Sequence, residues 1–310
     1  MRRARLAAAW ALATLALLPS VRAQDVPAPA AAPVLELLVL GSGGPGAVGR
    51  ASSSFVVMLD GKARILVDAG PGSFARAGEG KVALRTLDTV LLTHLHVDHV
   101  GELPGLLLGA AVSTGQRLNL RVFGPSAAGQ FPSTSRYMDL NFGPQGAYAY
   151  LKDFSAPLKL TTRDVAAQPV RPQVLLAEGD LKISAIPGHH RDAPAVIYRV
   201  DYRGHSVTFS GDIDAQGLPA LKQLAQGTDL LVFNSVVLDP PGSPSQLYQL
   251  HTPPGAIGQM AEQTHAGRLL LNHLSPAVEQ AQDAVLASIR SSYAGPVVFS
   301  ADLLRISDGR

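Results

Sequence analysis

The sequence predicts an α/β protein in which helices cover β-sheets. Short runs rich in Val, Ile, Leu and Phe recur along the chain, helical patterns separate several of them, and 46% of the residues are apolar whereas 16% are charged. Strands that occur in pairs and alternate with helices are typical of sheets packed against helices. The apolar fraction is that of a well-buried globular core.

The first 23 residues have the pattern of a secretory signal peptide. Arginines at positions 2, 3 and 5 precede an apolar run over residues 6–18, and Ala23 stands just before a polar pair. This run is shorter than the roughly 18 residues expected of a membrane-spanning helix. The pattern predicts cleavage after Ala23 and a periplasmic or secreted protein with no stable membrane insertion after cleavage.

A tether and one domain are expected after the signal peptide. Residues 24–33, rich in Ala and Pro, offer little to pack and are typical of a flexible linker. Residues 34–310 contain no repeat of fixed period and no sign of a second domain, so we expect them to form a single domain.

The elements of this domain follow from its apolar runs and helical patterns. Strands are expected at residues 35–40, 54–59, 64–68, 89–93, 120–124, 181–186, 196–202, 206–210, 230–234 and 268–272. Helices are expected at residues 218–224, 254–264 and 279–289. Residues 126–170, rich in Gly, Pro and aromatics, are interpreted as an insertion or active-site flap, and the sequence does not predict how they fold.

Charge and cysteine content limit the classes of function. The chain has a net charge of +2, and the predicted signal peptide holds four arginines and no acidic residue, which leaves −2 for the rest. This charge does not indicate a surface for polyanions, so a nucleic-acid partner is not expected. The absence of cysteine excludes disulfides and thiolate metal ligands.

The segment LLTHLHVDHVGEL, residues 91–103, places three of the nine histidines and one aspartate within six positions, directly after an apolar run. Imidazole nitrogens and carboxylate oxygens are ligands that suit Zn²⁺ and similar ions. A site without sulfur is more typical of catalytic than of structural zinc. The alternative, a surface cluster of histidines, does not explain why they gather at the end of a strand.

This segment resembles the HxHxDH signature of the metallo-β-lactamase superfamily. The loops LGSGGPG (40–46) and ILVDAGPG (65–72) are similar to those of its ribonuclease Z and arylsulfatase-like branch, with Asp68 supporting the metals from beneath. The resemblance implies a four-layer αββα sandwich and a metal-dependent hydrolase of ester bonds. It also implies two divalent ions, Zn²⁺ first, held by seven ligands: His94, His96 and His190 for one ion, Asp98, His99 and His273 for the other, and Asp212 shared.

One of these ligands is left open between two adjacent residues. The segment IPGHHRDAPAVIYR offers both His189 and His190 at the end of a strand. Strand periodicity favours His190, and counting back from Tyr198 allows either.

Two residues are expected to act in the chemistry. Two cations lower the pKa of a water between them and stabilise charge on the substrate, and Asp98 would bind metal and orient that water. His251, which the resemblance places beside the metals, would give the departing alkoxide a proton or a hydrogen bond, because imidazole titrates near neutral pH. The alternative for His251 is a residue that caps or packs at the start of a helix.

The predicted function is an exported dinuclear hydrolase of small-molecule esters, with sulfate or phosphate esters favoured. Export argues against a nuclease that processes cytoplasmic tRNA, so nucleic acid is predicted to be an unlikely substrate. The alternatives are a ribonuclease Z-like phosphodiesterase, a lactonase, or a metal-binding protein of the same fold without turnover. Neither the leaving group nor the oligomeric state is predicted.

Overall fold

A computed structural model describes residues 33–307, apart from residues 47, 115–117, 154–157 and 192. The predicted signal peptide and all of the predicted tether except Pro33 lie outside the described residues, so their boundaries stay predictions. No helix in the described part of the chain is long and apolar enough to span a membrane.

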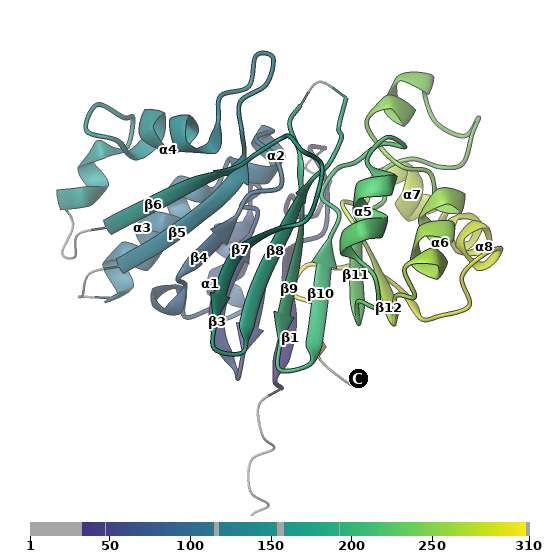
Figure 1. Ribbon diagram of the computed structural model, residues 1–310, viewed down its shortest axis with the longest axis horizontal. Coiled ribbons are helices and arrows are strands. Elements are labelled where there is room, and N and C mark those ends of the chain that lie inside the picture. The colour runs from purple at the N-terminus through teal and green to yellow at the C-terminus, as the bar shows by residue number, and fades with distance from the viewer. Residues whose placement is uncertain (1–32, 47, 115–117, 154–157, 192, 308–310) are drawn as a thin grey trace, which may run out of the picture. The chain divides into compact units, whose positions relative to one another are not determined.

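Two seven-stranded mixed sheets form the centre of the domain (Figure 1). The first sheet has, in spatial order, β14 (Arg305–Ser307), β1 (Leu35–Gly41), β2 (Ser54–Leu59), β3 (Lys62–Val67), β4 (Thr89–Leu91), β5 (Leu118–Pro125) and β6 (Leu158–Val165). The second has β13 (Val297–Phe299), β12 (Arg268–Asn272), β11 (Leu230–Asn234), β10 (His205–Phe209), β9 (Val196–Tyr202), β8 (Leu181–Pro187) and β7 (Gln173–Glu178).

Helices cover the outer face of each sheet. Those that follow strands of the first sheet are α1 (Ser73–Glu79), α2 (Val97–Val100), α3 (Leu103–Thr114) and α4 (Thr134–Phe142), with the short 3₁₀ helices η1 (Leu84–Thr86) and η2 (Ala149–Asp153). Those of the second sheet are α5 (Leu218–Leu224), α6 (Pro254–Gln263), α7 (Pro276–Gln280) and α8 (Gln282–Arg290), with η3 (Ser245–Gln249).

Three apolar clusters hold these layers together. The middle cluster joins the sheets face to face, as where the Phe55 and Phe209 rings lie 5.3 Å apart. A second cluster packs α1, α3 and α4 on the first sheet, and a third packs α5, α6 and α8 on the second. Strands buried on both faces are expected to be almost continuously apolar, which is how β11 and β12 read. The predicted four-layer αββα sandwich is confirmed.

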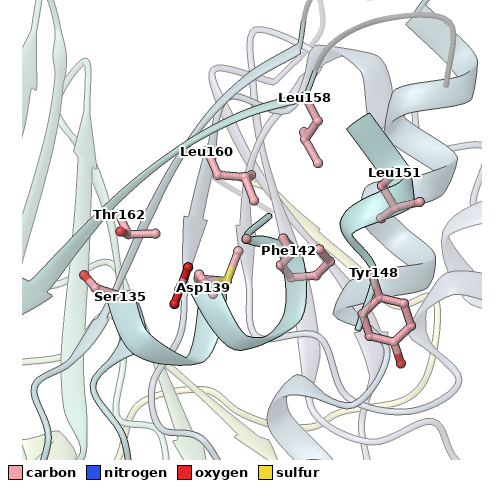
Figure 2. A pocket seen from close by; sticks show the side chains of 10 residues that line it. Ser135, Asp139, Phe142, Tyr148, Leu151, Leu158, Leu160 and Thr162 are labelled. Atoms are coloured by element: carbon pink, nitrogen blue, oxygen red, sulfur yellow. The ribbon is translucent and has the colours of Figure 1, made fainter. Parts of the chain in front are cut away.

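Residues 126–170 do not form a single flap. They contain α4, η2 and all of β6, and α4 packs on β5 and β6 as part of the outer layer. A cavity of about 270 Å³ lies between these elements. Figure 2 shows Phe142, Leu151 and Leu160 in its wall. The start of the segment reaches the predicted ligands, since the Phe131 ring lies 5.4 Å from that of His96.

The sheets bring several strand ends to one edge. Strands β10, β11 and β12 run parallel to one another, and so do β3 and β4. Parallel strands point their carboxyl ends the same way, and the loops after those ends are where α/β proteins place ligands. The histidine segment follows β4, and the other predicted ligands follow β8, β10 and β12.

Candidate metal centre

All seven predicted ligands and His251 meet at this edge. Their donor atoms fall into four overlapping groups, within each of which the atoms lie at most 4.8 Å apart. The groups are His94, His96 and His190; His94, His99 and Asp212; Asp98, His99 and His273; and His190, Asp212 and His251. The first and third groups are the two ligand triads expected from the sequence.

Asp212 lies between the two triads. Its Oδ2 is 3.9 Å from His94 Nε2 and 3.8 Å from His190 Nε2 on one side. On the other side it is 3.7 Å from His99 Nε2 and 3.5 Å from His273 Nε2. A carboxylate at this position can bridge two cations, as predicted for Asp212.

The donor set fits metal ions. His99 Nε2 and His251 Nδ1, which face Asp212, are buried with no hydrogen-bond partner among the described residues. Buried polar atoms without partners are costly and rare, and a missing ion is one standard explanation. His94 Nε2 and His96 Nδ1 also approach to 3.1 Å, a close approach that one shared cation would favour. Nitrogen and oxygen donors without sulfur suit Zn²⁺ in a catalytic site.

His190, and not His189, lies in this cluster. The His190 side chain is 2% exposed, and its Nδ1–H donates to the Leu250 carbonyl at 2.8 Å, which leaves Nε2 for the centre. The His189 side chain is 37% exposed and pairs instead with Asp214. The placement agrees with the register that strand periodicity favours.

The adjacent histidines give a direct test of this register. His190→Ala is expected to lose metal, because the first triad then has two ligands, whereas His189→Ala is expected to retain it. Metal content after dialysis against buffer measures both. Metal loss from the His189 variant with retention in the His190 variant would reverse the assignment.

Residues beneath the triads fix the ligands in place. Asp68 Oδ2 accepts from His99 Nδ1 at 2.8 Å and from Thr93 Oγ1 at 2.7 Å, and its Oδ1 accepts from the Thr93 backbone N–H at 2.7 Å. Asn234 Nδ2 donates to Asp212 Oδ1 at 2.7 Å, which leaves Oδ2 for the centre. A partner on the far nitrogen of a ligating histidine sets its tautomer and orientation.

Sequence reasoning placed Asp68 beneath the metals but missed three other residues. Thr93 and Asn234 could have been found from the sequence, because each is a polar residue at or just beyond the end of a buried strand. Gly44 gave none beyond its place in a Gly-rich loop. A Cβ on Gly44 would lie 2.4 Å from His273 Cε1, so the loop needs glycine there to let the imidazole pack against it.

Removing Asp68 is expected to weaken metal binding without removing a ligand. Asp68→Ala leaves His99 free to rotate or change tautomer, and losing such a partner typically costs about 10- to 100-fold in metal affinity. Competition with a chromogenic chelator measures the affinity. Asp180→Ala, an exposed carboxylate paired with Arg203, is the control. An unchanged affinity in the Asp68 variant would show that the His99 ring is held by packing alone.

The charges of the site favour the metal-binding forms of most ligands. Burial lowers the pKa of His94 well below its usual value and also lowers that of His96. Burial alone would raise the pKa of Asp212, but His273, His251 and His99 hold it well below its usual value. His99 differs: burial opposes its charge, yet Asp68 and Asp212 raise its pKa well above the usual value. Metal at His99 therefore competes with a proton.

His251 differs from the sequence-based expectation in one respect. Burial lowers its pKa to about 4, only partly offset by the charge of Asp212. The imidazole is then neutral near pH 7, whereas we expected it to titrate there. A neutral imidazole carries one N–H, so the hydrogen bond, rather than a spare proton, is the role that fits.

Known proteins resemble this chain over nearly its whole described length. A family described as the beta-lactamase superfamily domain matches residues 63–274. A ribonuclease Z of Mycobacterium avium is 30% identical over 285 residues, which covers 88% of this chain and 98% of the relative.

Two solved structures have the same fold. The short form of human tRNase Z superposes with a TM-score of 0.68 at 19% identity, over 88% of this chain and 98% of that one. Zn²⁺-bound PqqB from Methylobacterium extorquens superposes with a TM-score of 0.61 at 17% identity, over 88% and 99%.

These relatives correct the prediction about partners. Nucleic acid was expected to be unlikely as a substrate, whereas the curated relatives include ribonucleases Z, whose name states an action on RNA. The expectation was wrong because it used the predicted export and the net charge of −2 left after the predicted signal peptide. Net charge says little about the potential inside one cleft, where bound metal ions are often the largest local charges.

Proposed function

Because the chain belongs to the metallo-β-lactamase superfamily, we propose that it is a metal-dependent phosphodiesterase of the ribonuclease Z type that acts on RNA. It is a hydrolase of ester bonds. The observation that carries the proposal is the set of seven donor residues that includes Asp212, in a chain that covers 98% of a ribonuclease Z at 30% identity.

We propose two divalent ions, with zinc as the first candidate. His94, His96 and His190 would hold one, Asp98, His99 and His273 the other, and Asp212 both. Bound there, such ions activate water and stabilise negative charge on phosphorus. The zinc-bound structure of the same fold supports the identity of the metal.

Two residues of the chain would serve the chemistry beyond holding metal. Asp98 Oδ2 lies 3.1 Å from His273 Nε2 and 3.8 Å from His99 Nε2, so the carboxylate is at the centre and can orient the attacking water. Burial alone would raise the pKa of Asp98, but the hydrogen bond from His273 and the nearby histidines lower it, which keeps the carboxylate ionised. His251 would give the leaving oxygen a hydrogen bond.

The predicted preference for small sulfate or phosphate esters gains no support from a specific feature of the site. Export after cleavage at Ala23 stays a proposal, supported by the basic start and the short apolar run. A mature protein that begins at Gln24 would support it, and one that begins before Leu6 would contradict it.

A substrate panel tests the proposed function. The zinc-loaded protein is assayed on bis(p-nitrophenyl) phosphate, a precursor tRNA, p-nitrophenyl sulfate and a chromogenic lactone. We expect cleavage of the first two and its loss on chelation. A kcat/KM at least tenfold higher on the sulfate or the lactone would favour the alternative hydrolases. Bound zinc without turnover on any substrate would indicate a binding protein.

A further inference from the structure

The His189–Asp214 pair lies outside the metal ligands and is built like part of a site. Asp214 is 4% exposed, and its Oδ2 accepts from His189 Nδ1 at 2.7 Å. Its Oδ1 accepts from the Gln216 backbone N–H at 2.8 Å, and its own backbone N–H donates to the His189 carbonyl at 3.0 Å. Burying a carboxylate costs free energy, and a histidine at the surface does not require a buried carboxylate for its own stability. A carboxylate on one ring nitrogen fixes which nitrogen carries the proton.

This pair lines a groove beside the metal centre. The groove has a volume of about 510 Å³, and its walls include His189, Asp214, Gln216, Tyr248 and Gln249. The three loops that form it also build the centre. One loop carries His190, the second carries Asp212, and the third carries Leu250, whose carbonyl accepts the hydrogen bond from His190. Along the chain, His189 is therefore one residue from His190, and Asp214 is two residues from Asp212.

Arg191 brings a positive charge to the same groove. It is exposed, and its backbone is held in the left-handed region with φ of 52°. Its backbone N–H donates to Asp214 Oδ2 at 3.3 Å, so the carboxylate that fixes His189 also holds this turn. Among the described residues no carboxylate pairs with the Arg191 guanidinium. A guanidinium fork suits a phosphate group.

The free ring nitrogen of His189 suits a hydroxyl group. With Nδ1 bonded to Asp214, Nε2 is left for a substrate, and a hydroxyl can pair with it because a hydroxyl both donates and accepts. The 2′-hydroxyl of ribose is such a group and is what distinguishes RNA from DNA. The Tyr248 ring, in the same wall, offers a face on which a base can stack.

Taking the proposed function as a premise, we propose that His189, Arg191 and Tyr248 form a subsite for a ribonucleotide unit next to the cleaved bond. His189 Nε2 forms a hydrogen bond with the ribose 2′-hydroxyl, Arg191 binds the phosphate of that unit, and Tyr248 contacts its base. Asp214 is a positioning residue that acts through His189. The subsite makes the enzyme selective for ribose over deoxyribose.

Equilibrium binding tests the subsite without depending on turnover. Calorimetry on the zinc-loaded protein measures Kd for uridine 5′-monophosphate and for its 2′-deoxy counterpart. The wild type is expected to bind the ribonucleotide about 3- to 10-fold more tightly, the size of one neutral hydrogen bond. His189→Ala is expected to bring the ratio of the two Kd values to about 1. Asp214→Asn is expected to lower the ratio, and His189→Gln, which retains an acceptor, to restore part of it.

Two further variants separate the contributions. Arg191→Ala is expected to weaken both nucleotides about equally, by about tenfold, because a charge-assisted contact to phosphate ignores the sugar. His205→Ala is the control, since His205 begins β10 at the end opposite Asp212, and its ratio should match the wild type.

A wild-type ratio near 1, or a ratio unchanged in His189→Ala, would overturn the subsite. This outcome leaves the proposed function standing if the precursor tRNA is cleaved. Conversely, the ribose preference with its loss in His189→Ala, but no cleavage of RNA, would support the subsite and reject the ribonuclease.

Discussion

Replacing Asp212 with alanine is expected to lower kcat/KM on bis(p-nitrophenyl) phosphate by at least about 10³-fold and to reduce bound metal. Asp212 Oδ2 lies 3.5 to 3.9 Å from nitrogens of both triads. The substitution removes the shared carboxylate from both ions. It also leaves five buried imidazoles around a cavity that no longer contains the negative charge of Asp212. Metal-ion catalysis contributes several kcal/mol of charge stabilisation, and each 1.36 kcal/mol is tenfold in rate.

The measurements are metal per chain by mass spectrometry after dialysis, and kcat/KM with zinc in excess. Asp180→Ala, the exposed aspartate paired with Arg203, should behave as the wild type in both. Asn234→Ala removes only the bond to Asp212 Oδ1, and we expect an intermediate loss. Two full equivalents of metal in Asp212→Ala would show that the carboxylate does not bridge.

The site is built so that buried groups depend on the ions. Six histidines and two aspartates, most of them buried, face one another at the strand ends, and the ring nitrogens of His99 and His251 that face Asp212 have no hydrogen-bond partner among the described residues. Without cations, buried imidazoles and carboxylates must share a space shielded from water, which is costly. Metal binding and the order of these loops are therefore coupled, and metal removal should destabilise the loops after β4, β10 and β12 first.

Much of the fold could be predicted because the central strands are buried on both faces. The strands β9, β11 and β12 have the residue ranges expected from their apolar runs. The edge strands β6 and β7 were missed because their residues alternate or stay partly exposed, so no continuous apolar run marks them. The helix expected at residues 279–289 is two helices, α7 and α8, which meet at Ala281.

The site could be predicted as far as each residue carried its own signal. A histidine or aspartate just beyond a strand end is visible in the sequence, and the resemblance to a known family supplied the pairing of the triads. Contacts made across loops are not visible in this way. Asn234 and Asp212 are 22 residues apart, and the approach of Gly44 to His273 joins opposite ends of the domain. The prediction that nucleic acid is an unlikely partner failed for a related reason, because net charge does not say where in the molecule the charges lie.

His251→Ala is expected to retain its metals and to lose about 10²- to 10³-fold in rate, the scale for removing one hydrogen-bond donor that faces developing negative charge. His251 is 7% exposed, its Nδ1 lies 3.9 Å from Asp212 Oδ2, and it has no partner for that nitrogen among the described residues. This position lets the His251 imidazole reach the leaving oxygen of a substrate bound at the metals. The role as a capping residue is not supported, because the start of α6 has no side-chain cap.

The lowered pKa of His251 makes the expected pH dependence specific. Burial lowers that pKa to about 4, so the imidazole is neutral above about pH 5 and protonates only in more acidic solution. Between pH 6 and 8 the wild-type profile should therefore show no ionisation that disappears in His251→Ala. A step near pH 6.5 that the variant lacks would indicate instead that bound substrate raises the pKa and that His251 donates a full proton.

The size of the loss should depend on the leaving group. Nitrophenolate departs without help, so a hydrogen bond to it stabilises the transition state little, whereas the alkoxide of a ribose needs that bond. We therefore expect the loss in His251→Ala to be smallest on bis(p-nitrophenyl) phosphate and largest on RNA, with His205→Ala unchanged on both. An equal loss on the two substrates with metal retained would mean that His251 positions Asp212. If His251→Ala lost both metal and activity, His251 would be an eighth ligand. Its place in the group with His190 and Asp212 is compatible with that role.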